Sequence, residues 1–111
     1  MLKKLTERYV KAFANKDIAA IADLMDESFT LEDPVVKRVE GKVASLAAVE
    51  KIFQNCKKLN FRAKKIYQDG NSTIIEFMLD LDGVHLEGVD IIDWQEGRMR
   101  ELRAYLDIPK G

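Results

Sequence analysis

The chain has 111 residues, of which 47% are hydrophobic and 33% are charged, and its net charge at pH 7 is −1. This length suits one domain with one core, so we predict a single domain over residues 1–111. The balanced charge argues against nucleic-acid partners and against binding to a membrane surface. No apolar run is long enough to cross a bilayer, and the single cysteine and the missing apolar leader indicate a soluble cytoplasmic protein.

The first sixty residues have the apolar spacing of three amphipathic helices. These helices are expected over residues 2–14, from Asp17 to about Asp26, and from Ser45 to about Cys56. Asp17 and Ser45 are residue types that cap helix N-termini, because their side-chain oxygens accept hydrogen bonds from free backbone N–H groups. Between the second and third helices, residues 29–33 alternate like a short strand, and residues 35–42 are expected to form an irregular loop.

From residue 60 onwards the pattern changes to extended segments separated by turns that contain glycine. These turns are Asp69-Gly70-Asn71, Asp82-Gly83 and Glu96-Gly97. Asp-Gly between apolar runs strongly favours a β-hairpin, so the second half of the chain predicts a four-stranded antiparallel meander. Three helices followed by such a meander indicate an α+β domain.

The short strand before the proline places a carboxylate on an apolar face. Alternation along residues 29–33 puts Asp33 on the same side as Phe29 and Leu31, and it puts Glu32 on the opposite side. A carboxylate turned toward a core is costly unless it is paired, hydrogen-bonded or neutral. Asp33 is therefore a candidate functional acid, although an aspartate directly before Pro34 also fits a simple turn residue.

The third long strand repeats the same pattern. Asp90 shares its side of the strand with Leu86 and Ile92, unless a bulge next to Gly88 reverses the assignment. Buried charges are normally paired, so Asp90 also fits an ion pair with an arginine such as Arg100.

A third polar group lies on the apolar stripe of the first helix. Tyr9 alone fits a core aromatic residue, but together with Asp33 and Asp90 it predicts a polar cluster in a dry cavity, where pKa values shift and functional sites tend to lie. His85 falls on the solvent side of its strand, and Cys56 on an apolar helix face, so neither favours a catalytic triad or a zinc site. No metal is therefore expected, and the sequence has no glycine-rich phosphate loop, which argues against a nucleotide cofactor.

These residues resemble the ketosteroid isomerases of the nuclear-transport-factor-two-like superfamily, also called SnoaL-like. The resemblance is carried by Arg8-Tyr9-Val10, Asn15-Lys16-Asp17-Ile18, Leu24-Met25 and Thr30-Leu31-Glu32-Asp33-Pro34-Val35, and more loosely by Ala47-Ala48-Val49, Val89-Asp90 and Leu102-Arg103-Ala104. It implies three helices packed in a strongly curved antiparallel sheet, a cone-shaped α+β barrel with a deep apolar pocket. It also implies an apolar small-molecule ligand and no cofactor.

The resemblance assigns roles to the three polar residues. Asp33 corresponds to the general base, and Tyr9 and Asp90 correspond to the two groups that donate hydrogen bonds to the substrate oxyanion. In the isomerases a further tyrosine supports the first, and Phe53 stands at its position here. The candidate pocket-lining residues are Phe13, Met25, Phe53, Phe77, Leu86 and Ile92.

The resulting hypothesis is a small-molecule isomerase that moves a proton through an enolate. Two alternatives remain open: a SnoaL-type cyclase, and a module of the same fold that binds small ligands or dimerises without catalysis. A homodimer is predicted in any case, because the outward side of the two longest alternating strands is unusually apolar. The outward residues are Ile74, Met78, Val89 and Ile91.

Overall fold

The computed structural model describes residues 1–34 and 37–107. The helices are α1 (Leu2–Ala14), α2 (Ile18–Leu24) and α3 (Lys42–Gln54), and the strands are β1 (Met25–Asp33), β2 (Lys37–Glu40), β3 (Leu59–Asp69), β4 (Ser72–Leu81), β5 (Val84–Gln95) and β6 (Arg98–Leu106). The predicted α+β class with three helices is confirmed. Among the described residues, no helix has the length and apolar character needed to span a membrane.

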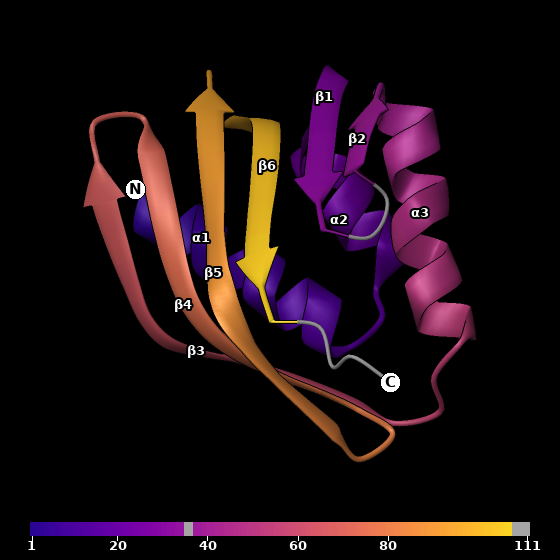
Figure 1. Cartoon of the computed structure of the whole chain (residues 1–111). Coiled ribbons are helices and arrows are strands. Elements are labelled where there is room, and N and C mark those ends of the chain that lie inside the picture. The colour runs from indigo at the N-terminus through magenta and orange to yellow at the C-terminus, as the bar shows by residue number, and fades with distance from the viewer. Residues whose placement is uncertain (35–36, 108–111) are drawn as a thin grey trace.

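The strands form one curved sheet in the order β2-β1-β6-β5-β4-β3, with α1 and α2 behind it and α3 beside β2 (Figure 1). The predicted meander is confirmed, because β3 to β6 pair in sequence as antiparallel neighbours. Two expectations are wrong. The sheet is open and does not close into the predicted barrel, since β2 and β3 are its edges. The sheet is also not wholly antiparallel, because β1 pairs with β6 in parallel. This pairing follows from topology, because β6 leaves one edge free and the segment after α2 fills it.

The segment between β1 and α3 differs from the prediction. Residues 37–40 form β2 instead of an irregular loop, because they pair with the end of β1 from Asp33↔Lys37 to Thr30↔Glu40. Residues 35 and 36, which the same prediction covers, lie outside the described residues. A short and strongly charged edge strand has little apolar alternation to reveal it in the sequence.

The two predicted helix caps have different outcomes. Asp17 caps α2, where its Oδ1 accepts a hydrogen bond from the Ala20 backbone N–H over 3.1 Å, and α2 ends at Leu24. Ser45 is not a cap, because α3 starts at Lys42 and Gly41 precedes it with a φ of 96°. That positive φ favours glycine and starts the helix one turn earlier than the serine pattern indicated.

The inner face of the sheet packs against the helices as the alternation predicts. The buried residues of the two longest alternating strands are Thr73, Ile75, Phe77 and Leu79 in β4, and Leu86, Asp90, Ile92 and Trp94 in β5. The pairing of β4 with β5 runs without interruption past Gly88 and Asp90, so no bulge reverses the assignment.

Glycine is required at position 88 because strands β5 and β6 approach closely there. A Cβ atom at this position would lie 2.6 Å from the Cβ of Leu106 and would also collide with the Tyr105 carbonyl oxygen. Gly88 pairs directly with Leu106, so the Leu106 side chain occupies the space above the glycine.

Buried hydroxyls connect α1 to the sheet. The Thr6 hydroxyl lies 2.8 Å from the Thr73 hydroxyl, and Trp94 Nε1 donates to the same Thr73 oxygen over 2.8 Å. Thr6 also donates to the Leu2 carbonyl oxygen, so each of these buried groups has a partner. Such satisfied polar contacts fix the position of a helix on a sheet more specifically than apolar packing does.

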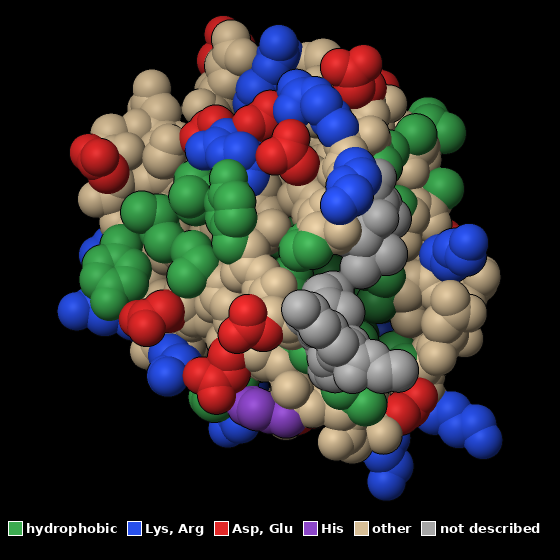
Figure 2. All heavy atoms as spheres, viewed as in Figure 1, with side chains coloured by type: hydrophobic (Ala, Val, Ile, Leu, Met, Phe, Trp, Pro, Cys, Tyr) green, Lys and Arg blue, Asp and Glu red, His purple; other side chains and the backbone are tan. Residues whose placement is uncertain are grey.

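The outer face of the sheet carries an apolar patch, which we call the outer patch. Its residues are Tyr67, Ile74, Met78, Val89, Ile91 and Tyr105. Figure 2 shows hydrophobic side chains gathered on this face over β3, β4 and β5, with charged side chains around them. The pairings Tyr67↔Ile74, Ile74↔Ile91 and Val89↔Tyr105 show that the patch continues across four strands.

Candidate active site

A cavity of about 90 Å³ lies between the helices and the inner face of the sheet. Its lining residues are Tyr9, Phe13, Leu31, Asp33, Val49, Ile52, Phe61, Phe77, Leu79, Asp90, Leu102, Ala104 and Leu106. Tyr9, Asp33 and Asp90 all line it, although they come from α1, β1 and β5. All other lining residues are apolar, so the cavity combines a small polar cluster with a dry wall.

The sheet register explains why the two acids meet. Asp90 pairs with Ala104 of β6, and Glu32 of β1 pairs with Arg103, so Asp33 lies beside Ala104 on its other side. The two acids therefore occupy neighbouring positions across three strands, with a methyl side chain between them. A larger residue in place of Ala104 would fill the space that the two carboxyl groups face.

Asp90 is the most perturbed acid of the site. It is 4% exposed, and burial, reinforced by the negative charge of Asp33, raises its pKa to about 8. Among the described residues, no hydrogen bond or ion pair reaches its carboxyl group. The alternative partner Arg100 is exposed and donates to the Ser28 hydroxyl instead. At neutral pH the Asp90 carboxyl is therefore mainly protonated and can act as a hydrogen-bond donor.

Tyr9 is held inside the core by aromatic neighbours. Its ring centroid lies 6.0 Å from that of Phe13 and 6.3 Å from that of Phe61, the latter in an edge-on arrangement. Burial, together with the charge of Asp90, raises the pKa of the Tyr9 phenol well above its usual value. Tyr9 thus keeps its proton across the physiological range and offers a second donor to the cavity.

Asp33 lies at the solvent side of the site. It is the last residue of β1, and its side chain is only half-buried. A shallower surface hollow of about 290 Å³, lined also by Lys37 and Tyr105, shares Asp33 and Ala104 with the cavity. Asp33 is therefore both the residue before the Pro34 turn and the carboxylate between the cavity and solvent.

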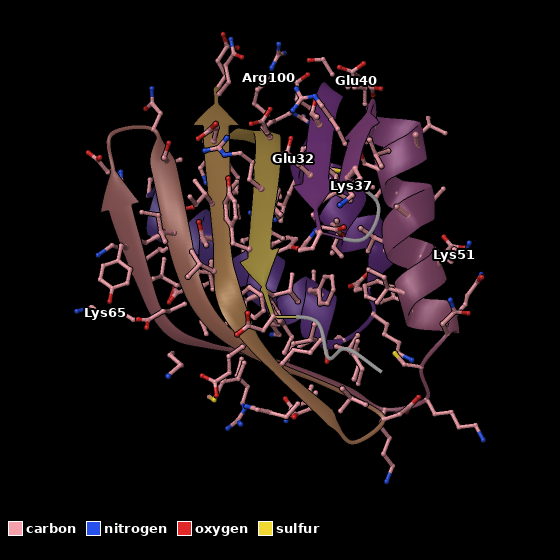
Figure 3. All side chains as sticks on the ribbon, viewed as in Figure 1. Glu32, Lys37, Glu40, Lys51, Lys65 and Arg100 are labelled. Carbon is pink, nitrogen blue, oxygen red and sulfur yellow. The ribbon has the colours of Figure 1, made fainter. Side chains whose placement is uncertain are left out.

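Glu32 points away from the cavity, as the alternation predicts. Figure 3 shows its side chain on the outer side of β1. Its carboxylate lies 3.3 Å from the Arg38 guanidinium, which also contacts Glu101 over 3.4 Å. The neighbouring acid thus belongs to a surface charge network.

The predicted pocket-lining residues divide into two groups. Phe13 and Phe77 line the cavity, whereas Met25, Phe53, Leu86 and Ile92 are buried in the core without lining it. Phe53 instead packs edge-on against Phe13, with the ring centroids 5.1 Å apart. Phe61 and Ala104 are lining residues that the sequence reasoning missed. The signal for Ala104 is the strand register, since it is the partner of Asp90.

Comparison with protein families shows that residues 6–102 match the model of the SnoaL-like domain. The chain belongs to the SnoaL-like family. No match was found among curated protein sequences. The resemblance to this family is therefore confirmed, and the match runs from within α1 to the middle of β6.

Three solved structures that are similar to this SnoaL-like protein belong to proteins with different named activities. A candidate ketosteroid isomerase from Kribbella flavida is 18% identical, with a TM-score of 0.82, covering 97% of this chain and 78% of its own. A candidate SnoaL-like polyketide cyclase from Jannaschia sp. CCS1 is 15% identical, with a TM-score of 0.82 and coverages of 94% and 83%. An epoxide hydrolase of M. tuberculosis is 17% identical, with a TM-score of 0.78 and coverages of 94% and 80%. These identities show a shared fold, so the activity must be argued from the site.

Proposed function

We propose that this SnoaL-like protein catalyses a proton-transfer isomerisation of an enolisable carbonyl compound, which shifts a C=C bond through an enolate. Asp33 is the base, and Tyr9 and Asp90 donate hydrogen bonds to the developing oxyanion. The observation that carries this proposal is Asp90, a buried carboxyl group with a pKa of about 8 in the same cavity as a second acid and a phenol.

The residue types match the steps of the reaction. Removal of a proton next to the carbonyl leaves a dienolate, and the same base must return that proton to a different carbon. The Asp33 carboxylate can perform both transfers, because it accepts the proton in the first step and donates it in the second. No other reactant enters, so the atoms and charges balance within the substrate and Asp33.

The two donors suit the charge that develops on the substrate oxygen. Donors that are fixed in a dry site stabilise such a charge strongly, and removal of one typically costs about 10² to 10³ in rate. A phenol and a protonated carboxyl supply two donors without burying a positive charge. The negative charge of Asp33 helps to keep Asp90 protonated, so the base and the donor support each other.

The size of the cavity bears on the substrate. At about 90 Å³ it is smaller than the roughly 300 to 1,000 Å³ of typical small-molecule pockets. This favours a compact carbonyl compound over a fully enclosed steroid.

The site supports the alternatives to different degrees. An intramolecular aldol cyclisation, as in a SnoaL-type cyclase, would use the same base and donors and differs only in the electrophile. An epoxide hydrolase of this fold uses an arginine between two acids, and no arginine lines the cavity among the described residues. A module without catalysis would pair its buried acid with a cation, but the described residues provide no such cation for Asp90.

Binding of 2-naphthol, which mimics an enolate when ionised, tests the oxyanion site. We expect Asp33→Asn to bind 2-naphthol about tenfold or more tightly than the wild type, because a like charge next to the naphtholate is removed. Fluorescence titration measures both affinities and reports whether the bound naphthol is ionised. The matched control is Glu32→Gln, which removes a carboxylate of the outer face and should leave the affinity unchanged. Absence of binding to both the wild type and Asp33→Asn would contradict the proposal.

We also propose that the protein is a homodimer that forms through the outer patch. Tyr105 is 52% exposed and Tyr67 is 41% exposed, and the apolar side chains between them make the patch larger than single scattered apolar residues. Sedimentation velocity should show a dimer for the wild type and a monomer for Ile91→Glu, which places a charge in the middle of the patch. Glu50→Lys on the exposed side of α3 is the control and should stay dimeric. A wild type that sediments only as a monomer at all concentrations would refute this prediction.

A further inference from the structure

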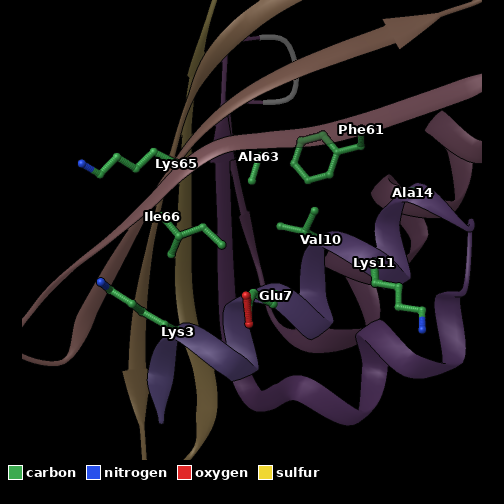
Figure 4. Close-up of a pocket in the computed structure, with 9 residues that line it drawn as sticks. All are labelled: Lys3, Glu7, Val10, Lys11, Ala14, Phe61, Ala63, Lys65 and Ile66. Carbon is green, nitrogen blue, oxygen red and sulfur yellow. The ribbon is translucent and has the colours of Figure 1, made fainter.

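A second and larger hollow lies between α1 and the edge strand β3, and Phe61 lines both this hollow and the cavity. Its volume is about 480 Å³, and we call it the α1–β3 groove. Its lining residues are Lys3, Glu7, Val10, Lys11, Ala14, Phe61, Ala63, Lys65 and Ile66 (Figure 4). The volume falls within the range of small-molecule sites. The proposed isomerase chemistry uses none of its polar residues.

The floor of the groove is apolar and partly open. Val10 and Ala14 contribute from α1, and Ala63 and Ile66 from β3, all of them half-buried against the core. Phe61 closes the floor, and its ring packs 4.8 Å from Phe13 and 5.1 Å from Phe77, measured between centroids. The groove therefore offers apolar surface over a rigid aromatic base.

The rim of the groove is positively charged. It carries Lys3, Lys11 and Lys65 against the single acid Glu7, which gives a net charge of +2 in a chain whose net charge is −1. None of these three lysines has an ion-pair partner among the described residues, whereas the adjacent Lys64 is paired with Glu87 over 3.6 Å. The Lys65 ammonium lies 5.0 Å from the centroid of the Tyr67 ring, a cation–π contact that leaves its charge uncompensated. The positive charge of the rim can therefore attract an anionic group.

We propose that the α1–β3 groove binds a free long-chain carboxylate, that is, an apolar chain with one anionic end. Figure 4 shows Lys3 and Lys65 at one end of the groove and Ala14 with Lys11 at the other. The carboxylate lies at the Lys3 and Lys65 end, and the chain runs over the apolar floor toward Ala14.

The length of α1 fixes the length of the ligand. From Lys3 to Ala14 the helix rises about 16 Å at 1.5 Å per residue. An extended chain advances roughly 1.2 Å per bond, by analogy with the extended backbone, so a chain of about fourteen carbons spans the groove and a chain of about twelve carbons covers most of it. A shorter acid would contact the lysines without covering the floor.

Titration calorimetry with dodecanoate, kept below its micelle concentration, tests this site. The Lys3→Gln, Lys65→Gln double variant should bind about tenfold more weakly, since each exposed charge contributes up to about fivefold. Glu7→Gln should bind about twofold to fivefold more tightly, because it removes the only negative charge of the rim. Lys51→Gln on α3, an exposed lysine far from the groove (Figure 3), should bind as the wild type does.

The ligand series separates the parts of the proposal. Butyrate should bind at least tenfold more weakly than dodecanoate, and dodecyltrimethylammonium, with the opposite charge, should not compete. High salt should weaken the binding of dodecanoate, because the rim is exposed. Equal affinity for the cationic and anionic chains, or unchanged affinity in both the lysine variant and Glu7→Gln, would overturn the proposal.

Two other results would also overturn it, by showing another location or another ligand. Displacement of dodecanoate by saturating 2-naphthol would place the chain in the interior cavity. Binding only to anionic phospholipid vesicles, with none to monomeric dodecanoate, would show a membrane surface as the partner. This proposal does not rest on the isomerase activity, so failure of one leaves the other intact.

Discussion

Replacing Asp33 by asparagine should lower the turnover of a β,γ-unsaturated ketone by about two to four orders of magnitude. The expected size follows from general acid–base catalysis, which typically contributes about 10² to 10⁴. Asparagine has nearly the same shape as aspartate and no basic oxygen, so Asp33→Asn removes the base and keeps the wall of the cavity. The rate is measured from the ultraviolet absorbance of the conjugated product. Two β,γ-unsaturated ketones are compared as substrates, a small cyclic ketone and a ketosteroid.

Glu32→Gln is the matched control for this measurement. Glu32 is adjacent to Asp33 in the same strand, but it lies on the outer side and contacts Arg38. Its variant should keep turnover within about twofold of the wild type, in line with the small effects of exposed ion pairs. Equal losses in Asp33→Asn and Glu32→Gln, or turnover that survives in Asp33→Asn, would exclude Asp33 as the base.

Replacing Asp90 by asparagine should change how the stability of the fold depends on pH. The pKa of Asp90 is about 8 in the folded protein and about 3.8 when the chain is unfolded and solvated. Between these values the folded state binds more protons than the unfolded state, so the free energy of unfolding must fall as the pH rises from about 4 to about 8. At 1.36 kcal/mol for each pKa unit, this loss is on the order of 5 kcal/mol.

Urea denaturation at pH 5 and at pH 8 measures this effect. Asparagine resembles the protonated carboxyl, so the excess stability of Asp90→Asn over the wild type should be small at pH 5 and several-fold larger at pH 8. Other groups with shifted pKa values, such as His85 and Glu87, are present in both proteins and cancel in the difference. Parallel pH profiles for wild type and Asp90→Asn would show that Asp90 is not held neutral by burial. Greater stability of the variant would also mark Asp90 as a residue kept at a cost to the fold.

The elements that the sequence predicts well are those with local rules. The three glycine-containing turns correctly separate β3 to β6, because each turn type has a residue requirement of its own. The position of β2 and the parallel contact between β1 and β6 could not be predicted in the same way. Both depend on which edge remains free once the other strands have paired, and that information is not contained in either segment alone.

The residues of the site also divide into those that local patterns predict and those that depend on contacts with other elements. Alternation alone placed Asp33 and Asp90 on inner faces and Glu32 on the outer face, because a period of two is strict within a strand. It did not identify Ala104 or Phe61, whose contribution depends on neighbours from other elements. The pairing of Asp90 with Arg100 was an alternative that local sequence could not decide, and the structure places that arginine at the surface beside Ser28.

The close contact at Gly88 has a consequence for mutational tolerance. Because Leu106 fills the space above this glycine and also lines the cavity, the missing side chain determines how far the last strand can close over the pocket. In a saturation scan, position 88 would reject even alanine, although Gly88 has no side chain to bind or react. Sensitivity there would report the shape of the pocket rather than its chemistry, and a search for catalytic residues by intolerance alone would misassign it.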